Sequence, residues 1–240
     1  MASEVHTRRF VQEWLRDGIR RQGVSRTLRA FTANIWAFLR DSTPSRRRQR
    51  YGDIDYDWDF RVDTTSGTVG WRDRLLGEFH SAYQPTEPEL FHEMVRSLEI
   101  DYANFTFIDL GSGKGRTLLM AAEYPFRRIL GVELLPGLHA VARENLQKFS
   151  SPAQKCFALE SRCEDARQFQ FPAEPMVLYL FNPLPEAALT EVMRNLMASL
   201  QARPRATRVL YCNPVLRHVV DATGLRVLTS STLYLVYDAP

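Results

Sequence analysis

The pattern of apolar and polar positions is most regular from residue 86 onward. Short apolar runs bounded by polar residues or glycine are typical of buried strands, and apolar residues at three- and four-residue steps are typical of amphipathic helices. The predicted strands are 105–110 (FTFIDL), 128–134 (RILGVEL), 155–160, 176–181 (MVLYLF), 208–212 (RVLYC), 225–229 and 232–238. The predicted helices are about 86–98, 115–124, 138–149 and 189–200, with a short one after residue 213.

Strands that alternate with helices predict an α/β fold, in which helices cover both faces of a mostly parallel sheet. The last two predicted strands are too close in sequence for a helical crossover, so they predict an antiparallel hairpin at the C-terminal edge. Thr86 and Glu89 have the spacing of a capping box, which predicts that Thr86 caps the helix that begins there.

Residues 1–80 follow a different pattern. Two amphipathic helices are predicted at 3–22 and 25–41, and a loop rich in arginine follows them. In GDIDYDWDF (52–60), aspartates alternate as in a calcium loop, but Trp58 stands where that loop needs glycine and Thr64 where it needs glutamate. We therefore expect a solvated extended segment at 52–60. The expected division is a basic helical extension and lid over 1–80 and an α/β domain over 81–240.

Composition adds little beyond a globular class, since 45% of the residues are hydrophobic and 25% are charged. Neither a signal peptide nor a membrane span is predicted. The cysteines Cys156, Cys163 and Cys212 lack the spacing of a zinc or redox site, so we expect no metal and reduced thiols in the cytoplasm.

The charge is distributed unevenly along the chain. Residues 1–50 contain twelve arginines and four acids, whereas the whole chain has a formal charge of only +3. This basic region is a solvated helical face, a docking surface for an acidic protein or nucleic acid, or a surface that lies on an anionic membrane.

The candidate chemistry centres on IDLGSGKG, at residues 108–115. A nucleoside triphosphate loop needs Ser or Thr after the lysine, where Gly115 stands, and a dinucleotide fingerprint would place its third glycine at Arg116. Asp109 ends the first strand just before the glycines. A carboxylate in that place favours a ligand with a cationic end over an anionic phosphate.

Two further acids follow the next two predicted strands. Glu133 lies 24 residues beyond Asp109, about where an acid binds ribose hydroxyls in nucleoside-binding folds. Asp165, followed by Ala166, comes after the third strand. Taken singly, Glu133 suits a solvated strand end and Asp165 a helix N-cap.

Together, these motifs resemble the class I S-adenosylmethionine-dependent methyltransferases over residues 83–238. The resemblance implies a Rossmann-like seven-stranded sheet and S-adenosyl-L-methionine as the cofactor. It implies that Glu133 binds the ribose, Leu134 flanks the adenine, and Asp165 with Ala166 meets the adenine amino group. The cofactor contacts near the first motif would be Asp109, Gly111, Ser112 and Gly113.

The fourth strand ends in LYLFNPLP, which is similar to the acceptor motif [DN]-P-P-[YFW] of this family. The resemblance implies that Asn182 and Pro183 are catalytic, that Asn182 also borders the cofactor, and that the acceptor is a nitrogen. Leu184 and Pro185 depart from the motif, so the usual aromatic wall is not in its place. The alternative is that Asn182 and Pro183 only turn the chain.

Other candidates lie around this site. In the family, a segment like YQPT covers the methionine end of the cofactor, which implies contacts from Tyr83 and Thr86. Asn213 ends the neighbouring strand, and His80 is a candidate base or a solvated side chain. The polar loop 61–67 would form a lid, and the candidates for lining the pocket, or for ordinary core packing, are Trp58, Phe60 and Trp71.

The function predicted from the sequence is methyl transfer from S-adenosyl-L-methionine to an acceptor nitrogen, on a protein side chain or a small molecule. The alternative is a protein that binds the cofactor without turnover and acts as an adapter through its basic N-terminal helices.

Overall fold

The computed structural model describes residues 54–64, 85–181 and 184–239. Contacts between Cα atoms divide the chain into two units, residues 1–52 and 53–240. The helices predicted at 3–22 and 25–41, and the boundary predicted at residue 80, lie outside the described residues and stay predictions. Within the described residues, no helix is long and apolar enough to cross a bilayer.

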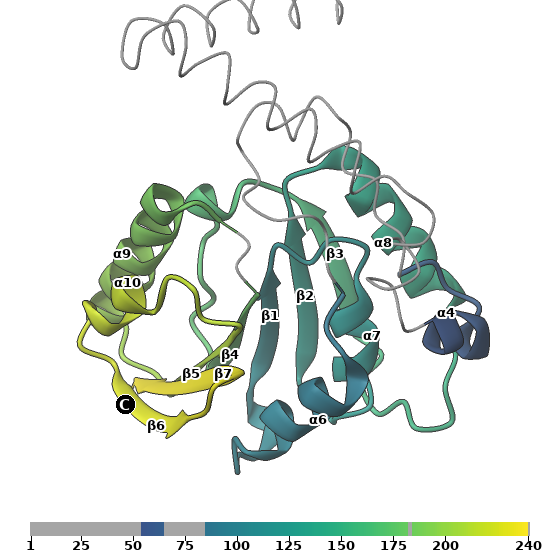
Figure 1. Cartoon of the computed structure of the whole chain (residues 1–240), viewed down its shortest axis with the longest axis horizontal. Coiled ribbons are helices and arrows are strands. Elements are labelled where there is room, and N and C mark those ends of the chain that lie inside the picture. The colour runs from purple at the N-terminus through teal and green to yellow at the C-terminus, as the bar shows by residue number, and fades with distance from the viewer. Residues whose placement is uncertain (1–53, 65–84, 182–183, 240) are drawn as a thin grey trace, which may run out of the picture. The chain divides into compact units, whose positions relative to one another are not determined.

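A seven-stranded sheet forms the centre of the second unit, with the order β3-β2-β1-β4-β5-β7-β6 (Figure 1). β1 to β5 run parallel, and β7 is antiparallel to both β5 and β6. The strands are β1 (Thr106–Leu110), β2 (Arg128–Glu133), β3 (Leu159–Cys163), β4 (Met176–Phe181), β5 (Thr207–Cys212), β6 (Arg226–Ser230) and β7 (Tyr234–Ala239). The fold predicted from the sequence is confirmed, including the antiparallel hairpin.

Helices cover both faces of this sheet, as Figure 1 shows. One face packs against α6 (Pro88–Arg96), α7 (Arg116–Ala121) and the end of α8 (Pro136–Lys148), and the other against α9 (Glu186–Ala202) and α10 (Arg217–Asp221). The central strands are therefore buried on both sides, which is why they appear in the sequence as continuous apolar runs and not as alternating ones. Short 3-10 turns, η1 (Tyr102–Asn104) and η2 (Ala166–Gln168), precede β1 and follow β3.

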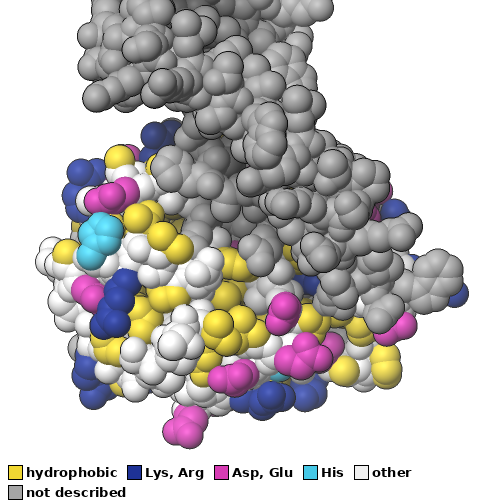
Figure 2. Space-filling view, viewed as in Figure 1, with side chains coloured by type: hydrophobic (Ala, Val, Ile, Leu, Met, Phe, Trp, Pro, Cys, Tyr) yellow, Lys and Arg dark blue, Asp and Glu magenta, His cyan; other side chains and the backbone are white. Residues whose placement is uncertain are grey.

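A buried carboxylate holds the antiparallel strands together. Asp238 on β7 pairs with Arg208 on β5 and with Arg226 on β6. β6 is an edge strand of the sheet, and Val227 and Leu228 on it are among the exposed apolar side chains. On the face drawn in Figure 2, such apolar side chains lie between acidic and basic ones.

Two local predictions are wrong. Residues 54–60 form a helix, α4 (Ile54–Phe60), and not an extended segment. The rings of Tyr56 and Phe60, one helical turn apart, lie 4.7 Å from each other, and Phe60 also packs against Phe149 at the end of α8. This aromatic face favours the helix, whereas the alternating aspartates in the sequence suggested a strand.

The third strand also begins later than predicted, at Leu159. The backbone amides of Lys155 and Cys156 both donate to the carbonyl of Ala122. These two residues therefore bind the end of α7, and only the chain beyond them can pair with β2.

We predict opposite effects of alanine at two glycines near the site. A Cβ at Gly131 would lie 2.6 Å from Leu118 Cδ1 and 2.6 Å from Ser112 Oγ, whereas a Cβ at Gly137 would meet nothing within 4 Å. Gly131→Ala should therefore lower the free energy of unfolding by about 1–3 kcal/mol because it overpacks the core. Gly137→Ala, in α8, should raise it by up to about 1 kcal/mol. Urea denaturation measures both, and equal effects would contradict the packing argument.

Candidate cofactor site

The glycine loop connects β1 to α7 at the carboxyl end of the sheet. Gly111, Gly113 and Gly115 have φ angles of 86°, 54° and 84°, which lie in the left-handed region that favours glycine. Three such residues within five positions produce the sharp turn from strand to helix. A side chain at Gly115 would in addition approach Ala142 of α8 to 3.3 Å.

The backbone amides of this loop are directed into the protein. Gly111 and Ser112 both donate to the carbonyl of Val132, at 2.8 and 3.0 Å, and Gly115 donates to the carbonyl of Ser112 at 2.8 Å. Gly113 donates to Glu133 Oε2 at 2.8 Å. A phosphate site needs amides that point toward the ligand. These four amides have protein partners, which agrees with the rejection of a phosphate loop from the sequence.

Glu133 connects the loop to the next helix. One carboxylate oxygen accepts from Gly113, and the other accepts from the amide of Leu135 at 2.8 Å, just before α8. Burial raises the pKa of Glu133, and the backbone hydrogen bonds act against this rise. An ionised carboxylate has about four acceptor positions, so it can accept a further donor beside these amides. The contact of Glu133 with a ribose stays a prediction, as does that of Leu134, whose side chain is exposed beside it.

Asp109 lies at the end of β1 and is buried. Its carboxylate accepts a hydrogen bond from the hydroxyl of Thr117 on α7. Burial raises the pKa of Asp109 to about 7, the Thr117 hydrogen bond lowers it, and the charge of Glu133 raises it. Two carboxylates at the same end of the sheet therefore favour a positively charged ligand.

The sequence placed Ser112 among the cofactor contacts, and its side chain turns toward β2. A Cβ on Gly131 would lie 2.6 Å from Ser112 Oγ, so glycine at 131 makes room for this side chain. The hydroxyl is buried and has no hydrogen-bond partner among the described residues. The acids and this hydroxyl fit a polar, cationic ligand such as S-adenosyl-L-methionine.

Thr86 does not cap its helix, so the predicted capping box is wrong. The N-cap of α6 is Glu87, without a side-chain hydrogen bond, and Pro88 follows it. Proline has no amide hydrogen, and it fits the first turn of a helix without a cap. The Thr86 hydroxyl instead lies 2.7 Å from the hydroxyl of Tyr179 on β4, and both are buried. The segment that enters the domain is thus bonded to the strand that leads to Asn182.

Asp165 is the N-cap of the short turn η2, with Ala166 as the first residue of that turn. Its carboxylate accepts from the amide of Arg167 at 2.9 Å and pairs with the Arg167 guanidinium at 2.6 Å. The arginine holds the pKa of Asp165 below its usual range. This is the cap that a single acid in this place suggested, and its contact with adenine stays a prediction.

Several predicted residues fall outside the part of the chain that the structure describes. These are Trp71, His80, Tyr83, Asn182 and Pro183, together with the side chain of Trp58 and the part of the predicted lid after Thr64. Asn213 is described: it is exposed, has a φ of 47°, and its amide donates to the carbonyl of Leu233. The described residues contain no cluster of His, Cys, Asp or Glu that could hold a metal ion.

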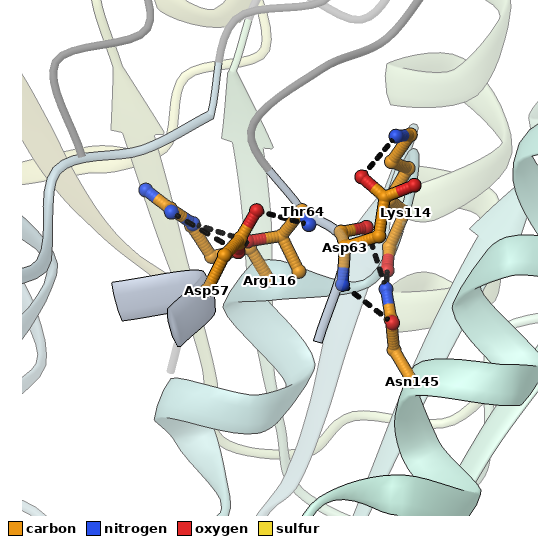
Figure 3. Close-up of polar contacts among 6 residues, drawn as sticks. All are labelled: Asp57, Asp63, Thr64, Lys114, Arg116 and Asn145. Atoms are coloured by element: carbon orange, nitrogen blue, oxygen red, sulfur yellow. Dashed lines mark hydrogen bonds and ion pairs between the residues drawn. The ribbon is translucent and has the colours of Figure 1, made fainter. Parts of the chain in front are cut away.

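Sequence reasoning missed a polar network beside the glycine loop, drawn in Figure 3. Lys114 Nζ lies 2.6 Å from Asp63 Oδ1, and Arg116 Nε donates to Thr64 Oγ1 at 2.7 Å. Asn145 of α8 binds the backbone of both Asp63 and Lys114. One signal was present in the sequence, because Asn145 lies in the apolar stripe of its helix, where a polar residue needs a buried partner.

Comparison with known families agrees with these motifs. Residues 78–173 match the family model of the histone methylation protein DOT1, which is less than half of the chain. The strand order, with β7 inserted antiparallel between β5 and β6, is the one that the resemblance implied. The chain has the fold of the class I S-adenosylmethionine-dependent methyltransferases, and the family match supports methyltransferase activity.

Solved structures with a similar fold include three methyltransferases. One is a ribosomal protein L11 methylase from Lactobacillus delbrueckii subsp. bulgaricus, with 11% identity over 63% of this chain and 76% of that chain and a TM-score of 0.45. Another is an RNA methyltransferase from Salinibacter ruber in complex with S-adenosyl-L-homocysteine, with 18% identity over 65% of this chain and 92% of that chain and a TM-score of 0.42. The third is the N-methyltransferase NodS from Bradyrhizobium japonicum WM9, with 12% identity over 63% of this chain and 95% of that chain and a TM-score of 0.46. Among curated proteins, the sequence comparison finds no significant match.

We predict that the methyltransferase binds its cofactor more weakly below pH 7. A cationic ligand prefers the ionised form of Asp109, and the pKa of about 7 leaves this carboxyl largely protonated at pH 6. Affinity for S-adenosyl-L-methionine should therefore be about tenfold lower at pH 6 than at pH 8, with a proton released on binding at pH 6. Calorimetry in buffers of different ionisation enthalpy measures both.

Two variants separate the contribution of Asp109 from other titrations. Asp109→Asn should bind weakly and lose the proton release. Glu133→Gln should keep it with a midpoint at lower pH, because the charge of Glu133 raises the pKa of Asp109. The same pH dependence in Asp109→Asn would contradict the assignment.

Proposed function

We propose that this methyltransferase transfers the methyl group of S-adenosyl-L-methionine to an amine nitrogen, and that a lysine side chain of a protein is the first acceptor class to test. When bound, the cofactor would supply an electrophilic methyl group, with the neutral thioether of S-adenosyl-L-homocysteine as the leaving group. In this proposal the residues of the chain bind the cofactor and orient the acceptor.

The position of β4 is the observation that carries this proposal. β4 pairs with β1 in register, with Tyr179 opposite Asp109 and Leu180 opposite Leu110. The next residues of the two strands are Phe181 and Gly111, and Asn182 follows Phe181 in the sequence. Ligands of open α/β sheets bind at this carboxyl edge.

An asparagine at this edge suits an amine acceptor. Its side-chain oxygen accepts a hydrogen bond from an N–H group, and it cannot donate a proton from that atom. An amine held in this way points its lone pair at the methyl group, and alignment of the reacting atoms is a large part of catalysis in a displacement. A lysine must also lose its proton before it can attack.

The family match supports a protein acceptor. Residues 78–173 match a family described as a histone methylation protein. This range contains the glycine loop and both following acids, so it covers the part of the site that binds the cofactor. The acceptor motif at 182–185 lies beyond it. The choice of a lysine side chain therefore rests on the family description together with Asn182.

We predict that Asn182→Ala separates cofactor binding from turnover. The variant should bind S-adenosyl-L-methionine within about threefold of the wild type, and methyl transfer should fall by about a hundredfold or more because the acceptor is no longer aligned. The assay uses cofactor with a labelled methyl group and a panel of histones, lysine peptides and small amines. A matched control is Asn104→Ala, at the opposite end of β1, which should leave both quantities unchanged.

The chemical stability of the product tests the acceptor atom. A methyl group on nitrogen survives mild base, whereas a methyl ester on a carboxylate is hydrolysed. Label that is lost in base, or turnover that is unchanged in Asn182→Ala, would contradict the proposal.

A further inference from the structure

The two cations of the motif GSGKGR do not point into the solvent. Lys114 and Arg116 flank the third glycine of the loop, and their side chains are 6% and 2% exposed. Both turn toward residues 54–64, a segment about 50 positions earlier in the chain (Figure 3). A buried cation is tolerated only where a partner compensates the lost hydration. The partners here are Asp57, Asp63 and Thr64.

Lys114 is bound through both its side chain and its backbone. Its ammonium lies 2.6 Å from Asp63 Oδ1, and its carbonyl accepts from Asn145 Nδ2 at 3.0 Å. The same Nδ2 donates to the carbonyl of Asp63 at 2.8 Å, and Asn145 Oδ1 accepts from the Asp63 amide at 2.9 Å. One buried side-chain amide thus pairs with the backbone of Asp63 as a neighbouring strand would. It links α8, the glycine loop and this segment.

Arg116 binds the other side of the segment. Its Nε donates to Thr64 Oγ1 at 2.7 Å, and its guanidinium lies 3.5 Å from Asp57 Oδ1 and 4.8 Å from the centre of the Tyr56 ring. Asp57 in turn accepts from the amide of Thr64 at 2.8 Å, which closes the turn after α4. The guanidinium therefore joins Asp57 in α4 and Thr64 at the end of the segment to the first turn of α7.

The loop needs such external support. Lys114 stands between Gly113 and Gly115, both with positive φ, and glycine has more conformational freedom than any other residue. On one side of the loop, Glu133 holds Gly113. On the other side, Asp63 and Asn145 bind Lys114, and Asp57 and Thr64 bind Arg116 just after the loop.

We propose that residues 54–64 support the cofactor site by fixing the conformation of the glycine loop. Lys114, Arg116 and Asn145 are the positioning residues that bind the loop and its neighbouring helices to this segment. Lys114 and Arg116 are thus not contacts to an anionic ligand. The proposal concerns cofactor binding and does not depend on the identity of the acceptor.

The test measures affinity for two ligands in variants of the full chain. S-adenosyl-L-homocysteine has an amino-acid carboxylate, and 5′-methylthioadenosine lacks it. Lys114→Met and Asp63→Asn should each weaken the binding of both ligands by about tenfold. The double variant should be no weaker than either single variant, because the two residues act through one interaction. Lys114→Arg should restore affinity to within about threefold, and Lys148→Met, in an exposed pair on α8, should change nothing.

A second measurement reports directly on the segment 54–64. The amides of Asp63 and Thr64 donate to Asn145 and Asp57, so their hydrogen exchange should be at least about tenfold faster in Lys114→Met and in Asn145→Ala.

Two outcomes would overturn the proposal. Loss of affinity in Lys114→Met for S-adenosyl-L-homocysteine alone would make Lys114 a contact to the ligand carboxylate. Unchanged affinity for both ligands, with the Asp63 and Thr64 amides exchanging faster, would make the segment structural only.

Discussion

The hydrogen bond between Glu133 and the amide of Gly113 is the interaction on which the site depends. It joins the end of β2 to the middle of the glycine loop, and the other oxygen of the same carboxylate joins the start of α8. The loop has three residues with positive φ and little rigidity of its own. The amides of Gly111, Ser112, Gly113 and Gly115 donate to Val132, Glu133 and the loop itself, so these four do not form a phosphate cradle.

Two buried carboxylates, Asp109 and Glu133, lie next to this loop at the ends of β1 and β2. Asp109 is protonated more easily than an ordinary aspartate, because burial raises its pKa to about 7. Protonation of Asp109 favours the folded state, so this contribution is fully present below the ordinary pKa of 3.8 and is lost as the pH rises through about 7. A cationic ligand acts against this loss because it stabilises the ionised carboxylate, so ligand binding and folding are linked at neutral pH.

Much of the fold was predictable because each strand is short, apolar and bounded by a turn signal. The order of strands could be predicted only through the family resemblance, since periodicity does not say which strands pair. Helix α4 was missed because the contact that favours it, Phe60 against Phe149, joins residues far apart in sequence. The partners of Lys114 and Arg116 were missed for the same reason. The capping box predicted for Thr86 does not form, because the Thr86 hydroxyl bonds to the buried hydroxyl of Tyr179, a partner that no local sequence pattern reveals.

The two halves of the site are constrained to different degrees. Asp109, Glu133 and the loop are fixed by hydrogen bonds within the sheet and its first helices, and the family match covers that half. The acceptor half begins where β4 ends, and there Leu184 and Pro185 replace the residues that would form an aromatic wall. Cofactor chemistry is common to many acceptors, whereas the walls of the acceptor pocket select one of them. Under the proposed function, a departure confined to residues 184 and 185 therefore bears on the choice of acceptor and not on the glycine loop or the two acids that follow it.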